Sequence, residues 1–379
     1  MRMLVLGAGL QGSACAYDLL QNPDVSQVRL ADLKLDHLAP FLAPYSGDRL
    51  IPTPLDVRDR EAVLAVMRES DAVMSAIPYY FNFPLAQLAV EAGVHFTDLG
   101  GNTAIVDQQR TLHDKAVEKG ITVIPDVGLA PGMVNILSQL GIDMLDTTES
   151  VRIFVGGLPQ KPQPPLNYQV VYSLEGVLDY YTTMSQIVRD GRLQEIDALS
   201  EVEAVHFDAP VGELEAFHTA GGLSTMGQRY EGKIPALEYK TLRFPGHADV
   251  MRSIRDLGFF GLEPVDVNGM KVVPRDLALA TMGPALRKNE PDMVVLRVEV
   301  SGRKDGKPAT HTWELVDRAD EKAGVSAMMR ATGYTLSIIG QMQARGEMAA
   351  NGVHTPDEVV PGEKYVAELA KRGINVVKK

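Results

Sequence analysis

The chain has 379 residues, 45% hydrophobic and 23% charged, a composition typical of a globular protein long enough for two domains. Its formal net charge of −12 argues against nucleic acid or an anionic membrane surface as the main partner. The single cysteine, Cys15, excludes an internal disulfide and a cysteine-based metal site. No apolar run approaches the roughly 20 residues of a membrane span. The N-terminal residues are predicted to form a core strand, so we expect no signal peptide. We therefore also expect a cytoplasmic protein.

The first predicted element is a buried strand that ends in a glycine-rich turn. The apolar run Met3–Leu6 is followed by the sequence Gly-Ala-Gly-Leu-Gln-Gly, and an amphipathic helix comes next. In a nucleotide-binding turn, Gly7 permits the tight turn, Gly9 lets the backbone approach a pyrophosphate, and Gly12 allows close helix–strand packing. The helix N-terminus then offers free N–H groups to the phosphates. We therefore expect a dinucleotide to contact Gly7, Gly9, Leu10, Gln11 and Gly12.

The second predicted strand ends in an acid that bears on the choice of cofactor. The run Val28–Ala31 leads to Asp32, 20 residues beyond Gly12. A carboxylate at this place accepts hydrogen bonds from the ribose hydroxyls of an adenosine. Asp32 also repels a 2′-phosphate, and no arginine follows it directly, although Lys34 is close. We therefore predict NAD, and Asp32 disfavours the alternative of a glycine turn that binds nothing.

Strands and helices alternate up to about residue 125, which predicts a Rossmann-type α/β domain with a doubly wound parallel sheet. Further strands are expected at 50–57, 71–78, 94–98 and 121–125, with helices at 60–69, 83–92 and 104–119. Ligands bind outside the carboxyl ends of such strands. We therefore expect these strand-end residues beside the cofactor: Asp56, Val57, Ala76, Ile77, Pro78 and Asp126. Asp98, at the end of the fifth strand, would also point toward the nicotinamide.

From about residue 150 the pattern changes to alternating strands. They are expected at 150–155, 237–244, 294–300 and 310–315. The last two read as a hairpin, because Asp305-Gly306 lies between them. We predict an α+β substrate domain with a mixed sheet over residues 131–324. A dinucleotide-binding domain over residues 1–130 would be completed by about 325–379, which includes a long helix at 326–345.

Four stretches of the second domain carry side chains able to handle a substrate: Tyr172–Gly176, Glu215–Gly222, Glu238–Arg243 and Gly246-His247. Arg243 has the planar fork that binds a carboxylate bidentately. His218 titrates near neutral pH and is a natural proton acceptor, whereas Lys240 could act as a base only if burial lowered its pKa. Taken together, these residues are interpreted as one polar pocket.

Each of these residues also has a structural interpretation. Glu175 can cap a helix, His218 can be a hydrogen-bonded loop residue, and Arg243 can pair with a structural acid. No histidines lie at a metal-ligand spacing, so no metal is predicted. His37 is interpreted as a surface or strand residue.

Several motifs together resemble the saccharopine dehydrogenase family. They are Gly7–Gly9 with Asp32, Asp98–Gly101, Gly128–Met133, Val155–Pro159, Tyr172–Gly176, Glu215–Thr219, Leu237–Thr241, Gly302–Lys307 and Val359–Gly362. The glycine fingerprint is common to many families, whereas the motifs in the middle of the chain are more specific. Within the family, the chain is most similar to members that oxidise the ε-amino group of L-lysine with NAD.

The resemblance implies hydride transfer from the terminal carbon of L-lysine to NAD. The resulting imine is hydrolysed to ammonia and 2-aminoadipate 6-semialdehyde, which can close to a cyclic imine. Because the ε-amine must lose a proton before the hydride leaves, a base is needed; side-chain chemistry suggests His218 first and Lys240 second. Arg243 would bind the substrate carboxylate, and Glu175 or Asp98 would hold an ammonium group.

Two other functions stay open at this point. One is a saccharopine-type or carboxynorspermidine-type dehydrogenase or reductase, which needs a larger pocket and usually NADPH. The other is a non-catalytic NAD(H)-binding regulatory protein. Family likeness also suggests a homo-oligomer.

Overall fold

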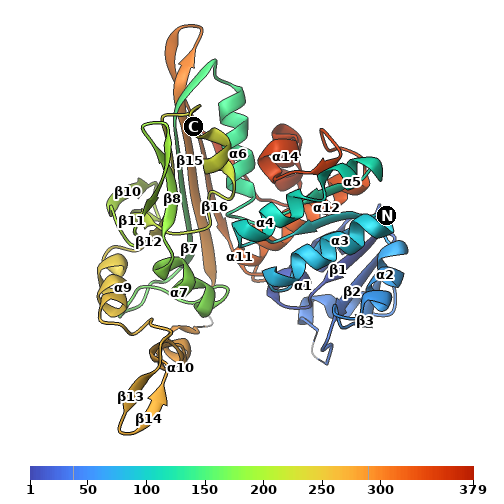
Figure 1. Ribbon diagram of the computed structural model, residues 1–379, viewed down its shortest axis with the longest axis horizontal. Coiled ribbons are helices and arrows are strands. Elements are labelled where there is room, and N and C mark those ends of the chain that lie inside the picture. The colour runs from blue at the N-terminus through green and yellow to red at the C-terminus, as the bar shows by residue number, and fades with distance from the viewer. Residues whose placement is uncertain (37, 289) are drawn as a thin grey trace. The chain divides into compact units, whose positions relative to one another are not determined.

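The computed structural model describes residues 1–36, 38–288 and 290–379, and the chain divides into two compact units (Figure 1). The first unit comprises Met1–Leu145, Ser224–Met226 and Ala319–Lys378. The second comprises Asp146–Leu223 and Gly227–Arg318, with Lys379. The expectation for His37 falls outside the described residues. In the described ranges, no helix is long and apolar enough to cross a membrane.

The first unit is built on a parallel sheet of seven strands, as the alternating pattern predicted. Its order is β17-β6-β5-β4-β1-β2-β3, and the part from β3 to β6 has the strand order of dinucleotide-binding domains. The strands are β1 (Arg2–Leu6), β2 (Gln27–Asp32), β3 (Leu50–Pro54), β4 (Ala72–Ser75), β5 (His95–Asp98), β6 (Thr122–Ile124) and β17 (Gly352–Val353). A short strand, β18 (Val377–Lys378), lies near the C-terminus.

Helices and strands alternate along the chain from β1 to β6, and further helices come from the C-terminal part of the unit. They are α1 (Leu10–Gln21), α2 (Arg60–Arg68), α3 (Asn82–Ala92), α4 (Thr103–Arg110), α5 (His113–Glu118), α6 (Met133–Asp143), α11 (Ala327–Met329), α12 (Thr335–Ala344), α13 (Pro356–Val359) and α14 (Gly362–Lys371), with short helical segments η1 (Pro40–Tyr45), η2 (Tyr79–Phe81) and η3 (Arg330–Tyr334). The single helix expected at 104–119 is two, because a turn at Thr111 separates α4 from α5. There the Thr111 N–H and hydroxyl both donate to the carbonyl of Gln108. The long helix expected at 326–345 contains a π-helical turn, η3.

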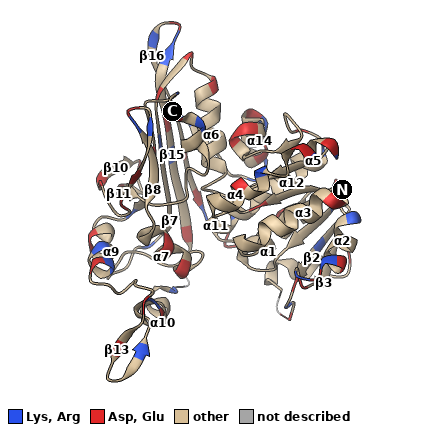
Figure 2. Ribbon diagram, viewed as in Figure 1, with Lys and Arg blue, Asp and Glu red and all other residues tan. Residues whose placement is uncertain are grey.

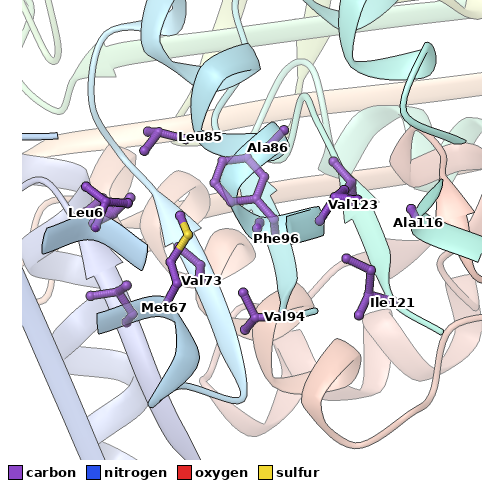
Figure 3. Packing of buried hydrophobic residues seen from close by; sticks show 14 of the residues in the cluster. Leu6, Met67, Val73, Leu85, Ala86, Val94, Phe96, Ala116, Ile121 and Val123 are labelled. Atoms are coloured by element: carbon purple, nitrogen blue, oxygen red, sulfur yellow. The ribbon is translucent and has the colours of Figure 1, made fainter. Parts of the chain in front are cut away.

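The core of the first unit lies between the sheet and helices α2, α3 and α5 (Figure 3). Phe96 of β5 is fully buried and packs in one cluster with Leu85 of α3, Met67 of α2 and Ala116 of α5. Burial of such side chains fixes the strands in register. Their carboxyl ends, where the candidate residues sit, are therefore held at one edge of the sheet.

The C-terminal residues complete the first unit. Helix α12 packs against β4 and β5 so closely that a Cβ on Gly340 would lie 2.2 Å from Sδ of Met74. Helix α6, which the sequence placed in the second domain, packs against α13 and α14 and belongs to the first unit. By packing, the first compact unit therefore extends to Leu145, and a domain boundary near residue 130 stays a prediction.

The second unit is built on a mixed sheet in the order β10-β11-β12-β7-β15-β16, with β8 and β9 beside β12. Only β12 and β7 run parallel along this path. Its strands are β7 (Thr147–Pro159), β8 (Ser185–Arg189), β9 (Arg192–Ile196), β10 (Glu203–Phe207), β11 (Gly212–His218), β12 (Ala236–Arg243), β15 (Asp292–Lys304) and β16 (Lys307–Arg318), with a separate pair β13 (Val265–Val267) and β14 (Met270–Val272). Its helices are α7 (Leu174–Thr182), α8 (Met226–Tyr230), α9 (His247–Asp256) and α10 (Pro274–Leu286).

The hairpin expected from Asp305-Gly306 is confirmed. Strands β15 and β16 pair antiparallel up to Lys304 and Lys307, and the two turn residues have φ values of 51° and 72°. Two positive φ angles are the signature of the tight turn that suits twisted strands.

The two faces of the mixed sheet bury different cores. On the first, which we call the helical face, Phe217 packs with side chains of α7, α9 and α10, including Tyr181 and Met251. On the second, the opposite face, Phe154 and Leu242 pack with side chains from β10, β11 and β15. This division decides which candidate residues can act together.

Candidate functional site

The glycine turn has the geometry that a dinucleotide requires. Gly7 has φ of 101°, and a Cβ there would lie 2.6 Å from the carbonyl oxygen of Ala76. A Cβ on Gly12 would lie 1.9 Å from the carbonyl oxygen of Gly7. A Cβ on Gly9 would meet no atom of the described residues within 4 Å. Gly7 and Gly12 are thus needed for the turn itself, whereas Gly9 leaves open space at the N-terminus of α1.

That open space is lined by groups suited to a ligand. Gly9 caps α1 without a side-chain hydrogen bond, so first-turn N–H groups are available to an anion. Leu10 is exposed, and the amide oxygen of Gln11 is buried without a partner among the described residues. The residues present therefore fit the diphosphate of a dinucleotide.

Asp32 lies beside this turn at the end of β2. Its carboxylate accepts hydrogen bonds from the N–H groups of Ala8, at 2.7 Å, and Lys34, at 3.1 Å. The side chain remains partly exposed. These two contacts hold the carboxylate next to the glycine turn, where ribose hydroxyls could reach it.

The neighbouring strand ends meet the same turn. Ala76 and Ile77, which follow β4, are the nearest contacts of Gly7, and Pro78 after them is exposed. Asp56 and Val57 follow β3 and are partly exposed. Hydrogen bonds from Arg58 lower the pKa of Asp56 to about 2, so its carboxylate is ionised.

Asp98 is fully buried and already hydrogen-bonded. Its carboxylate accepts from the side-chain amides of Asn82 and Gln109, at 2.9 and 2.7 Å, and from the N–H of Gly100 at 2.8 Å. Burial raises the pKa of Asp98 to about 7, and the nearby Asp126 also raises it. This carboxyl therefore joins the end of β5 to α3 and α4.

Asp126 is similarly enclosed. It has φ of 60°, and its carboxylate accepts from the N–H of Gly101, at 3.1 Å, and from the hydroxyl of Ser224. Burial raises its pKa. These contacts tie loops of the first unit together, and they do not leave the side chain at an open edge.

In the second unit, β12 sends its candidate residues to both faces of the sheet. Lys240 is directly opposite His218 on β11, and Arg243 is directly opposite Glu215. Because side chains alternate along a strand, the two pairs point to opposite faces. This corrects the hypothesis of one pocket: the helical face carries Arg243, and the opposite face carries His218 and Lys240.

His218 and Lys240 belong to a network of ion pairs on the opposite face. Lys240 Nζ lies 2.6 Å from Glu203, and Arg152 pairs with both Glu203 and Glu238 at 2.7 Å. The fully buried His218 lies 3.2 Å from Glu201 through Nε2. Burial, followed by the charge of Lys240, lowers the pKa of His218.

Three members of this network have ligand atoms close enough to hold a cation: Glu201, His218 and Glu238, within 4.8 Å of one another. Both carboxylates, however, are already neutralised, Glu201 by Arg189 at 2.8 Å and Glu238 by Arg152. The prediction that the chain binds no metal therefore stays a prediction.

Arg243 differs from Lys240, because it is buried and has no acid partner among the described residues. Its guanidinium lies 4.7 Å from the ring centre of Tyr168, and Nη1 donates to the carbonyl of Leu242 at 2.8 Å. Its Nε and the Tyr168 hydroxyl have no hydrogen-bond partner, and no carboxylate of the described chain lies within ion-pair distance. Burial lowers the pKa of Arg243, but nearby tyrosines, chiefly Tyr181, raise it overall.

The side chains around Arg243 are mutually ordered. The Tyr181 hydroxyl lies 3.0 Å from Nε2 of His247, and burial and Arg243 lower the pKa of His247 to about 3. The imidazole is therefore neutral, and its Nε2 can accept a hydrogen bond from the Tyr181 hydroxyl. Glu215 does not reach the guanidinium as a counter-ion, because its carboxylate accepts from the N–H groups of Gly246 and Ala248 at the start of α9.

Sequence reasoning found Arg243, Tyr172 and His247 but missed Tyr168 and Tyr181. Tyr168 precedes α7 and Tyr181 lies within it, and neither carries a local motif. Glu175 lies exposed in the first turn of α7, where Ser173 caps the helix. An acid at that position stabilises a helix dipole, which supports the capping interpretation.

Comparison with known proteins agrees with this architecture. The model named saccharopine dehydrogenase NADP binding domain matches residues 3–124, and the one named saccharopine dehydrogenase C-terminal domain matches residues 128–374. The two family models, together with the glycine turn, define an oxidoreductase with an NAD(P)-binding domain. The chain belongs to the saccharopine dehydrogenase family.

Some relatives match over the full chain. Saccharopine dehydrogenase (NADP(+), L-glutamate-forming) of Saccharomyces cerevisiae is 24% identical, with 100% of this chain and 98% of that protein aligned. The apo structure of the L-Glu forming enzyme from the same yeast has a TM-score of 0.81 at 23% identity, covering 100% and 99% of the chains. A homospermidine synthase from Legionella pneumophila in complex with NAD has a TM-score of 0.71 at 12% identity, covering 100% and 91%. At these identities the structures establish a shared fold.

Proposed function

We propose that this chain is an NAD-dependent L-lysine 6-dehydrogenase that oxidises the ε-amino group of L-lysine to 2-aminoadipate 6-semialdehyde, which can cyclise. The observation that carries the proposal is the buried guanidinium of Arg243, which has no acid partner in the described chain. A buried charge is costly unless it is paired. The carboxylate of an amino-acid substrate would supply that pair and would accept from Nε and from the Tyr168 hydroxyl.

Asp32 supports NAD over NADP. Its carboxylate is fixed beside the glycine turn by Ala8 and Lys34, where it would accept from ribose hydroxyls and repel a 2′-phosphate. The yeast relative is named for NADP(+), whereas the Legionella structure contains NAD. Cofactor preference is therefore part of the proposal and is tested with it.

The chain's own residues must bind the substrate carboxylate and take a proton from the ε-ammonium. When bound, the dinucleotide accepts a hydride from the carbon that carries the amine. His218 and Lys240, the bases suggested by sequence, lie on the face opposite Arg243 and are paired with Glu201 and Glu203. The geometry therefore favours a proton acceptor on the Arg243 side.

The test is a substrate screen with the purified chain. L-Lysine, saccharopine and cadaverine, which is lysine without its carboxylate, are each offered with NAD or NADP, and reduced cofactor is measured by absorbance. Reduction of NAD by L-lysine, with little activity on cadaverine, is the expected result. The absence of turnover with L-lysine across a broad pH range would contradict the proposal.

The second candidate is a saccharopine-type dehydrogenase, which the full-length match to the yeast protein favours. It predicts turnover of saccharopine with NADP in the same screen. A non-catalytic NAD(H)-binding protein instead predicts tight cofactor binding, no turnover of any amine, and no effect of Arg243→Ala on any measured property.

A further inference from the structure

His247 is a buried histidine whose position is set by the backbone around it. It is the first residue of α9, and only 2% of it is exposed. The carboxylate of Glu215 accepts hydrogen bonds from the N–H groups on either side of it, those of Gly246 at 2.8 Å and Ala248 at 2.6 Å. The start of the helix is therefore anchored to β11, and the imidazole is placed by the fold itself.

Three aromatic rings enclose this imidazole. The Phe217 ring stacks on it, with ring centres 6.2 Å apart and an angle of 6° between the planes. The rings of Tyr168 and Tyr181 meet it edge-on, with their centres 5.2 and 5.8 Å away. All three side chains are buried. The imidazole cannot turn without moving them, because buried side chains are closely packed.

The hydrogen bonds of His247 decide where the Tyr181 proton lies. Nδ1 lies 3.4 Å from the carbonyl oxygen of Leu166, which can only accept, so Nδ1 carries the ring proton. Nε2 is then an acceptor, and it lies 3.0 Å from the Tyr181 hydroxyl. Burial, followed by the charge of Arg243, lowers the pKa of His247 to about 3, so the ring has no second proton at neutral pH. The Tyr181 hydroxyl therefore donates to His247.

This arrangement fixes what Tyr181 offers to Arg243. Because its proton is directed to His247, the phenolic oxygen is left to accept from the guanidinium. Burial lowers the pKa of Arg243, and Tyr181 is the first of the neighbours that raise it above its ordinary value. A hydroxyl proton turned toward the cation would instead repel it. Nε of Arg243 has no hydrogen-bond partner among the described residues and stays available to a ligand.

Helix α9 supplies no acid partner to this guanidinium. Figure 2 shows acidic and basic residues along the helix. Its two acids, Asp249 and Asp256, pair with Arg252 and Arg255 of the same helix. Because no acid among the described residues pairs with Arg243, neutral groups must orient it.

We propose that His247 is a positioning residue: by accepting a hydrogen bond from the Tyr181 hydroxyl, it holds the Arg243 guanidinium in the orientation that binds the carboxylate of an amino-acid substrate. The proposal rests on the proposed function, in which Arg243 binds that carboxylate. His247 acts through Tyr181 rather than by touching the substrate. A guanidinium that is already oriented loses less conformational entropy when the carboxylate binds, so affinity depends on the hydroxyl that orients it.

Calorimetric titration of L-lysine into the chain with NADH bound, beside steady-state kinetics, tests the proposal. In Tyr181→Phe, the dissociation constant and the Michaelis constant for L-lysine should each rise about tenfold, and kcat should change less than about threefold. The low kcat/KM for cadaverine should stay the same, because cadaverine has no carboxylate. A general loss of structure would instead lower activity on both amines.

Two substitutions of His247 separate the roles of its nitrogen atoms. The amide of asparagine reaches the place of Nδ1, whereas the amide of glutamine reaches the place of Nε2. His247→Asn should therefore weaken L-lysine binding as much as Tyr181→Phe does. His247→Gln, whose amide oxygen can still accept from the Tyr181 hydroxyl, should stay within about threefold of the wild type.

The double variant shows whether His247 acts through the hydroxyl. Tyr181→Phe combined with His247→Asn should bind L-lysine as Tyr181→Phe does alone, because the group that His247 orients is already absent. Tyr365→Phe is the matched control. Tyr365 is fully buried in the first unit, and its hydroxyl lies 2.7 Å from that of Thr335. Its removal should lower the melting temperature and leave the dissociation constant for L-lysine unchanged.

Equal affinity for L-lysine in the wild type, Tyr181→Phe and His247→Asn would overturn the proposal, and so would additive losses in the double variant. Failure of the proposed function gives a different result. L-Lysine that binds without reducing NAD contradicts the proposed reaction alone, and the affinities of the variants still test His247. If only saccharopine is turned over, the same pattern is expected with saccharopine, which also carries carboxylates. A wild type that binds neither compound overturns both proposals.

Discussion

Lys240 and Arg243 lie three residues apart on β12 and point to opposite faces of the mixed sheet. Lys240 enters a network in which each acid has a basic partner, whereas Arg243 is enclosed by tyrosines without an acid among the described residues. Two cations on one strand therefore have different physical roles. Removing one partner of an enclosed ion pair destabilises the fold, whereas a buried cation without an acid is a ready site for an anionic ligand.

Replacing Arg243 should weaken substrate binding without lowering the stability of the fold. In Arg243→Met, the Michaelis constant for L-lysine should rise at least about 100-fold, because a charge-assisted contact to the carboxylate is lost. The free energy of unfolding should be unchanged or higher by about 1–2 kcal/mol, since an unpaired buried charge is removed. Steady-state kinetics and urea unfolding measure the two effects.

Arg152→Met is the matched control, because Arg152 also lies over an aromatic ring, that of Phe154, at 4.9 Å. It is paired with Glu203 and Glu238, so its removal should lower stability and leave the Michaelis constant for lysine nearly unchanged. If both variants lost stability equally and bound substrate equally, Arg243 would be structural.

His218→Asn tests the base suggested by sequence. Because His218 is buried on the face opposite Arg243 and lies beside Glu201, we expect kcat/KM to change by less than about threefold, with a lower melting temperature. The pH profile of kcat/KM should keep its shape. A loss of two or more orders of magnitude, with a flattened profile, would restore His218 as the general base.

The glycine turn offers a paired test of cofactor binding. Gly12→Ala should lower the free energy of unfolding by at least about 2 kcal/mol, because its Cβ would meet the Gly7 carbonyl at 1.9 Å. Gly9→Ala meets no protein atom within 4 Å, so stability should change by less than about 1 kcal/mol. Its dissociation constant for NADH, measured by fluorescence, should nevertheless rise, because the methyl group occupies the expected pyrophosphate position. Normal NADH affinity in Gly9→Ala would argue against that position.

Asp32→Ser tests the choice of cofactor. Loss of the carboxylate removes its repulsion of a 2′-phosphate and its hydrogen bonds to the ribose. The ratio of kcat/KM for NAD to that for NADP should fall at least about tenfold. A wild type that prefers NADP would contradict the reasoning from Asp32 directly.

The buried Asp98 predicts a pH-dependent stability. Its pKa is about 7 in the folded chain against an ordinary value of 3.8, so the folded state holds the proton more tightly. The contribution of Asp98 to the free energy of unfolding is therefore fully present below about pH 4. It is lost as the pH rises to about 7, and the loss reaches up to about 4 kcal/mol. In Asp98→Asn this loss should be absent. Gln109, whose amide oxygen is unpartnered, can turn that oxygen toward the new amide.

Urea unfolding at pH 5 and pH 8 measures the Asp98 effect. The control is Asp146→Asn, because hydrogen bonding to Lys304 lowers the pKa of that exposed acid below 3.8. Its contribution to stability therefore changes only below about pH 4, and the variant should show the wild-type difference between pH 5 and pH 8. Equal slopes for wild type and Asp98→Asn would show that Asp98 does not titrate in this range.

Local signals in the sequence predicted much of the fold. The turn at Gly7–Gly12 needs glycine for steric reasons that hold in any chain, and Asp305-Gly306 adopts positive φ angles by itself. Alternation of apolar strands with amphipathic helices likewise predicted the parallel sheet. These features depend on neighbours within a few residues.

The sequence by itself determined the nucleotide-binding turn, the acid beside it, the hairpin and the presence of Arg243. Only the tertiary structure decided that His218 and Lys240 face away from Arg243 and that Asp98 and Asp126 are enclosed. It also decided that Arg243, unlike Lys240, has no acid partner among the described residues. The reason is that strand register, burial and charge compensation are set by residues far apart in the chain. Arg152 and Glu238, for example, are 86 residues apart and pair only after folding.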